Sequence, residues 1–274
     1  MLIELWIVSA RKLLSQNFLW SRELVSKLIR DSSISQNDFV LEIGPGKGII
    51  TESLLGVSRN IVAIETDGIL FDLLKQRFSG NPTLTLIRGD FLKFPLPEEN
   101  YKVFANIPFA ITGEVVKRLI FAKNPPLDSY LVVQSEAALK FVAKNSRNTM
   151  AAILFYPWFD IGVIHKFQRS DFKPIPRVDS CLIRIEKRSS PLINESLLSI
   201  YRDFIIYHFT RDRSATSRSP SFWLTRFDSF VGGNDLRMHS KIEGSFDKWQ
   251  DEERKLAKIH RTRTDKDWKR YGSQ

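Results

Sequence analysis

The sequence predicts a mixed α/β protein: a Rossmann-like, doubly wound and mostly parallel sheet followed by a small C-terminal helical domain. Short apolar runs alternate with amphipathic helical patterns between about residues 21 and 185. Such alternation is typical of parallel sheets whose strands are joined by crossover helices. A glycine-rich turn follows the first apolar run, as in doubly wound sheets that bind nucleotides. These two observations define the expected fold class.

Five short apolar runs in the first half of the chain are predicted to be strands. They cover residues 39–43, 60–64, 84–87, 102–105 and 129–133. Stretches with apolar residues at helical spacing are predicted to be helices, namely residues 49–55, 69–78, 114–121 and 136–143. After residue 150 the alternation of apolar runs and helical patterns ends. Three further runs resemble strands without intervening helices, which predicts an antiparallel extension of the sheet at residues 152–159, 162–167 and 181–186.

The composition shifts beyond about residue 188. Residues 192–209 and 221–230 are predicted to be helical, and the stretch 210–220, which is rich in Ser, Thr and Arg, is predicted to be a loop. Residues 254–270 hold eight basic and two acidic residues. This stretch is either a basic arm for RNA or a solvated tail, since charge runs are usually solvated.

The charge balance favours a polyanionic partner. Forty-one basic residues stand against thirty-one acidic ones, for a net charge of +10, and neutralising phosphates releases counterions. The alternative is a charge that serves solubility alone. A single cysteine, Cys181, excludes an internal disulfide framework and a cysteine-built zinc cluster, and it fits a reducing, cytoplasmic compartment. With no long apolar run and no basic start before the apolar residues 1–10, we expect neither a membrane span nor a signal peptide.

The glycine-rich turn follows Glu42 and contains Gly44, Gly46 and Gly48. Glycines at this spacing allow a tight turn and a close approach of the backbone to a ligand. The spacing differs from the dinucleotide-binding pattern and from the phosphate-binding P-loop. The alternative for the glycines alone is a plain strand–helix turn.

Two carboxylates follow the next two predicted strands. Glu65 ends the second strand and can accept hydrogen bonds from both ribose hydroxyls of an adenosyl group. Asp90 follows the third strand and can accept a hydrogen bond from an adenine amino group, with Phe91 packed nearby. Helix capping and turn formation are the alternatives. Because the carboxyl ends of successive strands form the ligand-binding edge of such sheets, we expect these groups and the glycine turn to share one site.

Asn106, Ile107, Pro108 and Phe109 close the fourth predicted strand. They fit a pattern of Asp, Asn or Ser, then Ile, Leu or Pro, then Pro and an aromatic residue, which marks methyltransferases that act on exocyclic amino groups. The whole order of motifs resembles the ribosomal RNA adenine N6-methyltransferases, the superfamily of the Erm and KsgA (dimethyladenosine transferase) enzymes. The resemblance covers roughly residues 12–188, with matches at residues 16–19, 42–48, 65, 90–91, 106–109 and 172–179.

The resemblance implies S-adenosylmethionine as cofactor and a class I methyltransferase sheet. It implies that residues 16–19 close over the cofactor, with Asn17 and the backbone of Leu19 at its methionine end, although Asn17 alone could be a turn residue. The expected cofactor-binding residues are Gln16, Asn17, Leu19, Glu42, Gly44, Gly46, Glu65, Asp90, Phe91 and Asn106.

The resemblance also implies how the target adenine is held. The Asn106 side chain and a backbone carbonyl near Ile107 accept hydrogen bonds from the amino group and aim its lone pair at the methyl group, while Pro108 stiffens the turn. Phe109 stacks on the base, which must be turned out of its helix or loop. Phe172 is expected to stack on the opposite face. A role in the core is the alternative for both aromatic residues.

Two positions depart from the family pattern. Phe109 stands where many relatives carry Tyr, which preserves stacking but removes a hydroxyl. Gly113 stands where many relatives carry Thr or Ser, which loosens the start of the following helix.

Within the superfamily the chain resembles the Erm branch more than the KsgA branch, because it has Asn-Ile-Pro rather than Asn-Leu-Pro-Tyr, and because of residues 106–120 as a whole. The resemblance thus implies methylation of an adenine in 23S rRNA and resistance to macrolide, lincosamide and streptogramin antibiotics. The alternatives are a KsgA-type 16S rRNA enzyme, a non-catalytic RNA-binding relative and a DNA adenine methyltransferase. We expect a monomer without metal, a methyltransferase domain over residues 1–187 whose first 20 residues form an extension and cofactor lid, and an RNA-binding domain over residues 188–274.

Overall fold

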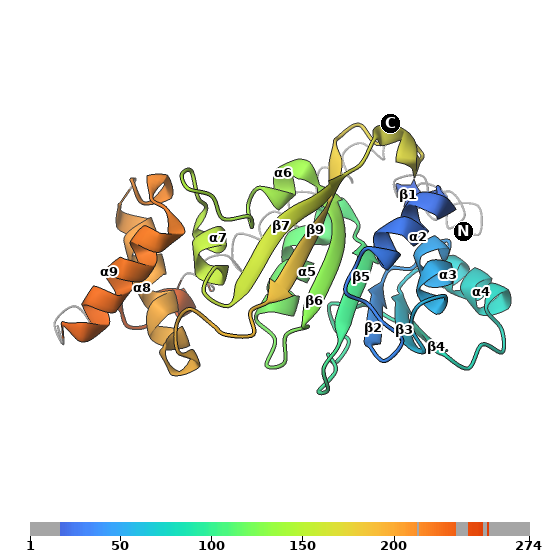
Figure 1. The fold of residues 1–274 in the computed structure, drawn as a ribbon, viewed down its shortest axis with the longest axis horizontal. Coiled ribbons are helices and arrows are strands. Elements are labelled where there is room, and N and C mark those ends of the chain that lie inside the picture. The colour runs from blue at the N-terminus through green and yellow to red at the C-terminus, as the bar shows by residue number, and fades with distance from the viewer. Residues whose placement is uncertain (1–16, 213, 234–240, 249–250, 252–274) are drawn as a thin grey trace, which may run out of the picture. The chain divides into compact units, whose positions relative to one another are not determined.

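The computed structural model describes residues 17–212, 214–233, 241–248 and 251. The chain folds into two compact units (Figure 1). Of the described residues, the first unit contains 17–142 and 158–190, and the second contains 143–157 and those from 191 onward. The segment 143–157, which lies before the expected boundary at residue 187, therefore belongs to the second unit. Among the described residues, no helix has the length and apolar character needed to cross a membrane.

The first unit is built on a seven-stranded sheet with the strand order β4-β3-β2-β5-β6-β9-β7. Strands β2 to β6 run parallel to one another, whereas β9 pairs antiparallel with both β6 and β7. The bounds are β2 Phe39–Ile43, β3 Asn60–Glu65, β4 Leu84–Arg88, β5 Lys102–Asn106, β6 Asp128–Gln134, β7 Phe159–Lys166 and β9 Ser180–Lys187. This arrangement confirms the expected Rossmann-like fold class, including its antiparallel extension.

Helices join β2 to β3, β3 to β4 and β5 to β6. They are α3 Ile49–Leu55, α4 Gly68–Arg77 and α5 Thr112–Ile120, preceded by α2 Arg22–Arg30 and followed by the short α6 Ser135–Ala138. Ser21 caps α2 because its hydroxyl accepts a hydrogen bond from the Leu24 N–H. Val25 and Ile29 of α2 and Leu54 of α3 are fully buried in one apolar cluster with residues of the sheet. Burial of these helix faces against the sheet fixes the positions of the loops at the strand ends.

A second, two-stranded sheet lies beside the first and pairs segments that are far apart in the sequence (Figure 1). Strand β1 Phe18–Leu19 pairs antiparallel with β8 Phe172–Lys173, so that Phe18 faces Lys173 and Leu19 faces Phe172. The short 3-10 helix η2 Arg169–Asp171 precedes β8. This pairing ties the start of the described chain to the connection between β7 and β9.

The prediction of a strand over residues 152–159 is wrong. The structure has the helix α7 Met150–Phe155, and β7 begins only at Phe159. Thr149 caps α7 because its hydroxyl accepts the Ala152 N–H at 3.1 Å. The run 152–155 is buried on every side, so its apolar pattern has no period that distinguishes a strand from a helix. Helix α6 is likewise shorter than the expected 136–143.

The second unit is helical, with α7, α8 Leu198–Arg211 and α9 Pro220–Gly232. Its core is aromatic: Phe204 contacts Trp223 and Phe227 edge-on. The Tyr201 hydroxyl donates to the Ile153 carbonyl at 2.9 Å and ties α8 to α7. In the stretch expected to be a loop, α8 runs on to residue 211 and the 3-10 helix η4 Ala215–Ser217 follows. The basic stretch 254–270 lies outside the described residues.

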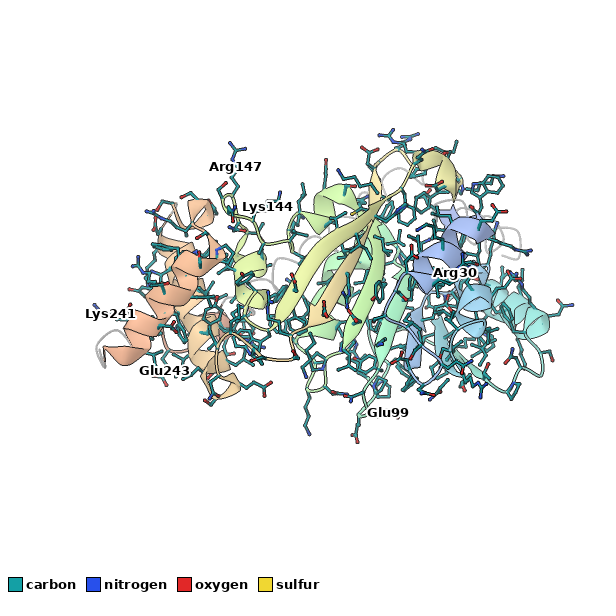
Figure 2. The ribbon with its side chains drawn as sticks, in the orientation of Figure 1. Arg30, Glu99, Lys144, Arg147, Lys241 and Glu243 are labelled. Carbon is teal, nitrogen blue, oxygen red and sulfur yellow. The ribbon has the colours of Figure 1, made fainter. Side chains whose placement is uncertain are left out.

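Charged side chains of the loops extend away from both units (Figure 2). Arg147, in the loop between α6 and α7, has a φ of 58°. Its side chain and that of Lys144 are labelled in Figure 2, where they extend away from the ribbon of this loop. Glu99, in the loop before β5, does the same in the first unit.

Candidate functional site

A cavity of about 570 Å³ opens at the carboxyl ends of the parallel strands. Open α/β sheets bind ligands at this edge, and the volume lies within the range of small-molecule sites. Five segments line it: residues 17–19, residues 43–50 after β2, residues 64–66 at the end of β3, residues 89–92 after β4 and residues 106–111 after β5. Within these segments Gly48 is the one residue that does not touch the cavity. The topology therefore brings most of the sequence-predicted residues together.

The glycines of the turn after β2 serve different purposes. Gly44, Gly46 and Gly48 all have positive φ, at 65°, 60° and 80°. A Cβ on Gly46 would lie 2.8 Å from the Phe18 ring, and one on Gly48 would lie 2.7 Å from Phe78, so these two glycines are needed for packing. A Cβ on Gly44 would meet no protein atom within 4 Å. Because Gly44 lines the cavity, its bare backbone is open to a ligand.

Glu65 presents a carboxylate to the cavity at the end of β3. The residue is 3% exposed, and its Oε2 accepts the Gly46 N–H at 3.0 Å while its Oε1 accepts the Asp67 N–H at 2.8 Å. Burial raises the pKa of Glu65, and these backbone hydrogen bonds oppose the shift. Each oxygen keeps a further lone pair. The carboxylate can therefore accept two more hydrogen bonds, as a ribose diol would offer.

Glu42 was expected to contact the cofactor, but the structure places it behind the glycine turn. The side chain is fully buried and does not line the cavity. Its Oε2 accepts the Thr51 hydroxyl at 2.7 Å, and its Oε1 has no hydrogen-bond partner among the described residues. Burial raises the pKa of Glu42 to about 8, and the neighbouring Glu65 adds to the shift. Glu42 thus joins β2 to the first turns of α3, where it supports the turn.

Asp90 and Phe91 line the cavity after β4, as expected. Asp90 is exposed, and its Oδ1 accepts the Leu92 N–H at 2.9 Å, which fixes the carboxylate by a local turn. Phe91 is 5% exposed and lies under the guanidinium of Arg118, 5.7 Å from the ring centre. The second carboxylate oxygen of Asp90 is left for a donor in the cavity.

Asn106 ends β5 with its amide oriented by the backbone of another segment. Its Nδ2 donates to the carbonyl of Asn17 at 2.9 Å. An amide has one donor end and one acceptor end, so this bond leaves Oδ1 as the group that is available to accept. Asn106 lines the cavity, which makes Oδ1 an acceptor for an amino group placed there.

The turn after Asn106 is rigid. Ile107 is 1% exposed and its N–H donates to the Val132 carbonyl at 3.3 Å. The carbonyl of Pro108 accepts the Ile111 N–H at 3.0 Å, which starts the 3-10 helix η1 Phe109–Ile111. Phe109 is partly exposed and lines the cavity. Gly113, where relatives carry Thr or Ser, lies in the first turn of α5.

Phe172 differs from its expected role as a second stacking residue. It is 1% exposed, does not line the cavity and packs edge-on against Phe167 at 5.3 Å. Pairing of β8 with β1 directs Phe172 and Leu19 to the same buried face. Asn17 and Leu19 do line the cavity, and Gln16 lies outside the described residues.

The cavity also has lining residues that sequence reasoning did not single out. Thr66 directly follows Glu65, Leu92 follows Phe91, and Ala110 follows Phe109. Their positions at strand ends could have marked them, because each adjoins an expected residue. Lys47 also lines the cavity, with its ammonium 5.0 Å from the centre of the Phe18 ring. Within the described part of the chain, no group of three His, Cys, Asp or Glu side chains could hold a metal ion.

The chain was compared with known protein families and sequences. Residues 7–221 match the family model described as ribosomal RNA adenine dimethylase. The rRNA adenine N-6-methyltransferase of Bacillus licheniformis is 31% identical over 189 residues, which are 67% of this chain and 64% of that protein. The ribosomal RNA small subunit methyltransferase A of Mycoplasmopsis pulmonis is 33% identical over 74% of this chain and 81% of its own length. The chain therefore spans a little under two thirds of the Bacillus relative.

Solved structures show the same two kinds of relative. The 23S rRNA methyltransferase ErmE matches with a TM-score of 0.67 and 28% identity, over 73% of this chain and 83% of that one. A dimethyladenosine transferase from Plasmodium falciparum matches with a TM-score of 0.62 and 26% identity, over 72% of each chain.

Proposed function

Since this chain belongs to the ribosomal RNA adenine dimethylase family, we propose that it transfers methyl groups from S-adenosylmethionine to the exocyclic amino nitrogen of an adenine in ribosomal RNA. The observation that carries the proposal is the orientation of Asn106. Its Nδ2 is held by the Asn17 carbonyl, so its Oδ1 is an acceptor at the cavity. An adenine amino group is a donor that such an acceptor can hold.

The cavity fits the cofactor at three points. The open space in front of Gly44 admits a ligand against bare backbone. Glu65 has acceptor capacity for the two ribose hydroxyls, and Asp90 has it for an adenine amino group. Asn17 and Leu19 line the wall next to Asn106, where the methionine end would lie. When bound, S-adenosylmethionine supplies a methyl group on a sulfonium, which needs no further activation.

The residues after β5 then position the acceptor nitrogen. The lone pair of an adenine amino group is delocalised into the ring, which makes the nitrogen a weak nucleophile. A hydrogen bond to Asn106 Oδ1 pulls the group out of that plane and aims the lone pair into the cavity. Phe109, half-buried on η1, offers a face on which the everted base stacks. Catalysis here is mainly positioning, which contributes by holding reactants in a near-attack geometry.

We propose 23S rRNA as the substrate, which would confer resistance to macrolide, lincosamide and streptogramin antibiotics. The likeness to ErmE supports it, with a TM-score of 0.67 against 0.62 for the dimethyladenosine transferase. The small-subunit enzymes among the relatives support 16S rRNA as the second candidate. Either substrate places the protein in the cytoplasm, where ribosomes are. We also propose that the protein acts as a monomer.

The test is to methylate purified 23S and 16S rRNA in separate reactions, using S-adenosylmethionine with a labelled methyl group. Mass mapping of the products locates the modified base. We expect label on the N6 position of one adenine in 23S rRNA. Label on 16S rRNA alone would favour the small-subunit function, and no label on either RNA would reject the proposed activity. Expression in a macrolide-sensitive bacterium should raise its resistance only in the first case.

A further inference from the structure

A half-exposed tryptophan stands next to the cavity, where the fold does not need it for the core. Trp20 follows β1 and is 51% exposed, whereas the preceding Leu19 is 4% exposed. Residues two apart on a strand share a face, and directly paired residues do so too. Because Phe18 faces Lys173 across the pair, Phe18, Trp20 and Lys173 lie on the face of the β1–β8 sheet opposite to the buried Leu19 and Phe172. We call Trp20 and Lys173 the tryptophan platform.

The ring of Trp20 is held in place although it is exposed. Its Nε1–H donates to the Ser170 carbonyl at 2.7 Å, and its backbone N–H donates to the Asp171 carbonyl at 3.2 Å. The ammonium of Lys173 lies 3.4 Å from the centre of the ring. An aromatic ring fixed in this way loses little conformational freedom when a ligand stacks on it.

The surroundings of the platform are basic. Four basic residues are exposed here: Lys166 at the end of β7, and Arg169, Lys173 and Arg177 in the segment that connects β7 to β9. Two carboxylates lie in this segment: Asp179 pairs with Arg169 at 2.8 Å, and Asp171 accepts the Gln168 N–H at 2.8 Å, so the four cations outnumber the carboxylates by two. Lys173 stacks on an aromatic ring instead of a carboxylate, so its charge is not neutralised there. A positive surface that carries a fixed aromatic ring matches single-stranded nucleic acid, which offers phosphates and flat bases.

The platform lies within a few nucleotides of the proposed target base. Asn17, Phe18 and Leu19 line the cavity, and Asn17 holds the Asn106 side chain. Trp20 is three residues beyond Asn17, which is about 10 Å along an extended chain. Stacked nucleotides are about 3.4 Å apart, so the same distance covers about three of them.

We propose that the tryptophan platform docks the RNA strand beside the target adenine, with Trp20 stacked on a flanking nucleobase and Lys173 against a phosphate. The proposal rests on the proposed function, because it takes RNA as the substrate. The proposal adds a contact outside the cavity, between the tryptophan platform and the nucleotides next to the target adenine. Trp20 and Lys173 are therefore positioning residues for RNA and do not touch the reacting atoms.

The experiment compares full-length Trp20→Ala, Trp20→Phe and Lys173→Gln with the wild type. The control is Leu73→Ala, which removes an apolar side chain of similar exposure (44%) from α4, far along the chain from the platform. Binding is measured by fluorescence anisotropy with a labelled 12-nucleotide single-stranded RNA and with 23S rRNA fragments, at several salt concentrations. Affinity for S-adenosylmethionine and the melting temperature are recorded for every variant.

We expect Trp20→Ala to weaken RNA binding about 10-fold and to raise the KM for RNA similarly, with a smaller change in kcat. Trp20→Phe should retain most of the affinity, because a phenyl ring still stacks. Lys173→Gln should lower the slope of log affinity against log salt by about one. RNA affinities of all three variants equal to those of the wild type and Leu73→Ala would overturn the proposal. If Trp20→Ala loses its fold, the RNA affinity and the salt slope of Lys173→Gln decide.

This design separates the two proposals. RNA binding is read without methyl transfer, so a wild-type protein that binds RNA through Trp20 but methylates no rRNA would reject the proposed function alone. Equal methylation of rRNA by Trp20→Ala and by the wild type would reject the platform alone.

Discussion

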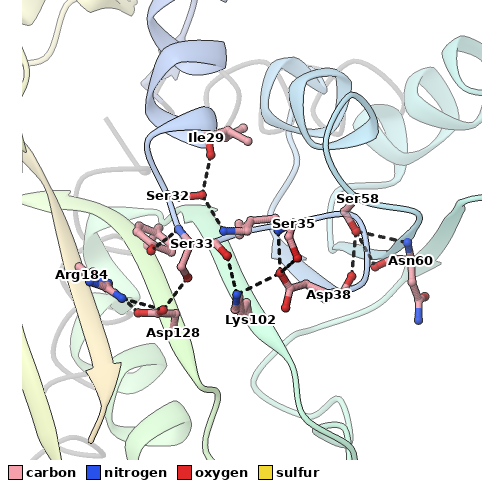
Figure 3. A network of polar contacts seen from close by, with 12 residues as sticks. Ile29, Ser32, Ser33, Ser35, Asp38, Ser58, Asn60, Lys102, Asp128 and Arg184 are labelled. Atoms are coloured by element: carbon pink, nitrogen blue, oxygen red, sulfur yellow. Dashed lines mark hydrogen bonds and ion pairs between the residues drawn. The ribbon is translucent and has the colours of Figure 1, made fainter. Parts of the chain in front are cut away.

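At the amino ends of β5 and β6, carboxylates are matched by cations, whereas at the carboxyl ends carboxylates and amides are held by backbone groups. Asp128 accepts two hydrogen bonds from Arg184, at 2.7 and 2.9 Å, and a third from the Ser33 hydroxyl at 2.6 Å (Figure 3). Nearby, Lys102 pairs with Asp38 at 3.0 Å and donates to the Ser33 carbonyl (Figure 3). These polar groups pair with one another at the amino ends of the strands, which we call the closed end of the sheet. The carboxyl ends, where the cavity opens, are the open end.

At the open end, carboxylate and amide side chains keep oxygen lone pairs that can still accept hydrogen bonds. Glu65 takes only backbone N–H donors, Asp90 takes one, and Asn106 uses its amide nitrogen and keeps its oxygen. A fully paired group contributes stability and offers nothing to a ligand, whereas a group fixed by one bond keeps its orientation and still binds. Substitutions at the two ends should therefore affect different properties.

The largest effect is expected at the open end. Asn106→Ala removes the acceptor that aims the target nitrogen, and we expect kcat to fall about 10²–10³-fold, the range seen when one preorganised hydrogen-bonding group is removed. Affinity for S-adenosylmethionine and the melting temperature should change little. Asn124→Ala is the matched control, because the Asn124 side chain donates only to the carbonyls of Pro97 and Glu99, outside the cavity. Normal turnover in Asn106→Ala would contradict the assigned role.

The closed end should respond in stability. Arg184→Met leaves the carboxylate of Asp128, 7% exposed, without its cation, and we expect the free energy of unfolding to fall by about 3 kcal/mol. Methyl transfer per folded molecule should stay near wild type. Urea unfolding and active-site titration measure the two quantities. The double variant Asp128→Asn/Arg184→Met should recover part of the loss, and an equal loss in both variants would argue against the pairing as its cause.

Glu42 sharpens the comparison, because it is a buried carboxyl at the open end without a cation. Its pKa is raised to about 8 in the folded protein, from 4.5 ordinarily. Below pH 4.5 both states hold the proton, but as pH rises toward 8 the unfolded state loses it first, so stability declines. Glu42→Gln cannot ionise and should be more stable than wild type at pH 8 by on the order of 2 kcal/mol, with little difference near pH 4.5. Unfolding curves at both pH values test this, and a pH-independent difference would refute it.

The smallest effect is expected at Gly44. Comparing it with Gly80 separates the cost of backbone strain from the loss of a contact with the ligand. Gly44 and Gly80 both have positive φ, and a Cβ on either meets no protein atom within 4 Å. Alanine at each should cost about 1 kcal/mol of stability. Only Gly44 lines the cavity, so only Gly44→Ala should weaken binding of S-adenosylmethionine, by about 10-fold in calorimetric titration. Equal affinities in the two variants would show that the cofactor does not approach Gly44.

The sequence allowed the parallel core and the ligand-binding edge to be predicted, because both follow from local patterns. Alternating strands and helices specify the topology, and residues just after each strand must then meet at one edge. Glu65 and Asp90 were found in this way, whereas Asn106 was found from the family pattern that it begins, and the structure places all three on the cavity.

The failures have a common physical cause, which is contact between distant segments. Phe172 is buried because β8 pairs with β1, more than 150 residues away, and two-residue strands carry no pattern of their own. Residues 150–155 form a helix within the second unit, where burial on all sides removes the amphipathic signal. Glu42 looked like a ligand because it precedes the glycines, but a strand residue that points beneath the turn cannot reach the cavity.

The bond from Asn106 to the backbone of Asn17 has a consequence for assembly of the site. The two ends of an amide are nearly the same size, so shape alone does not decide which end faces inward. Here the orientation is set by the carbonyl of Asn17, the residue before β1, which also lines the cavity. Residues 17–19 therefore both enclose the cavity and orient the amide of Asn106, so one short segment sets the shape of the site and the side of the amide that faces a ligand.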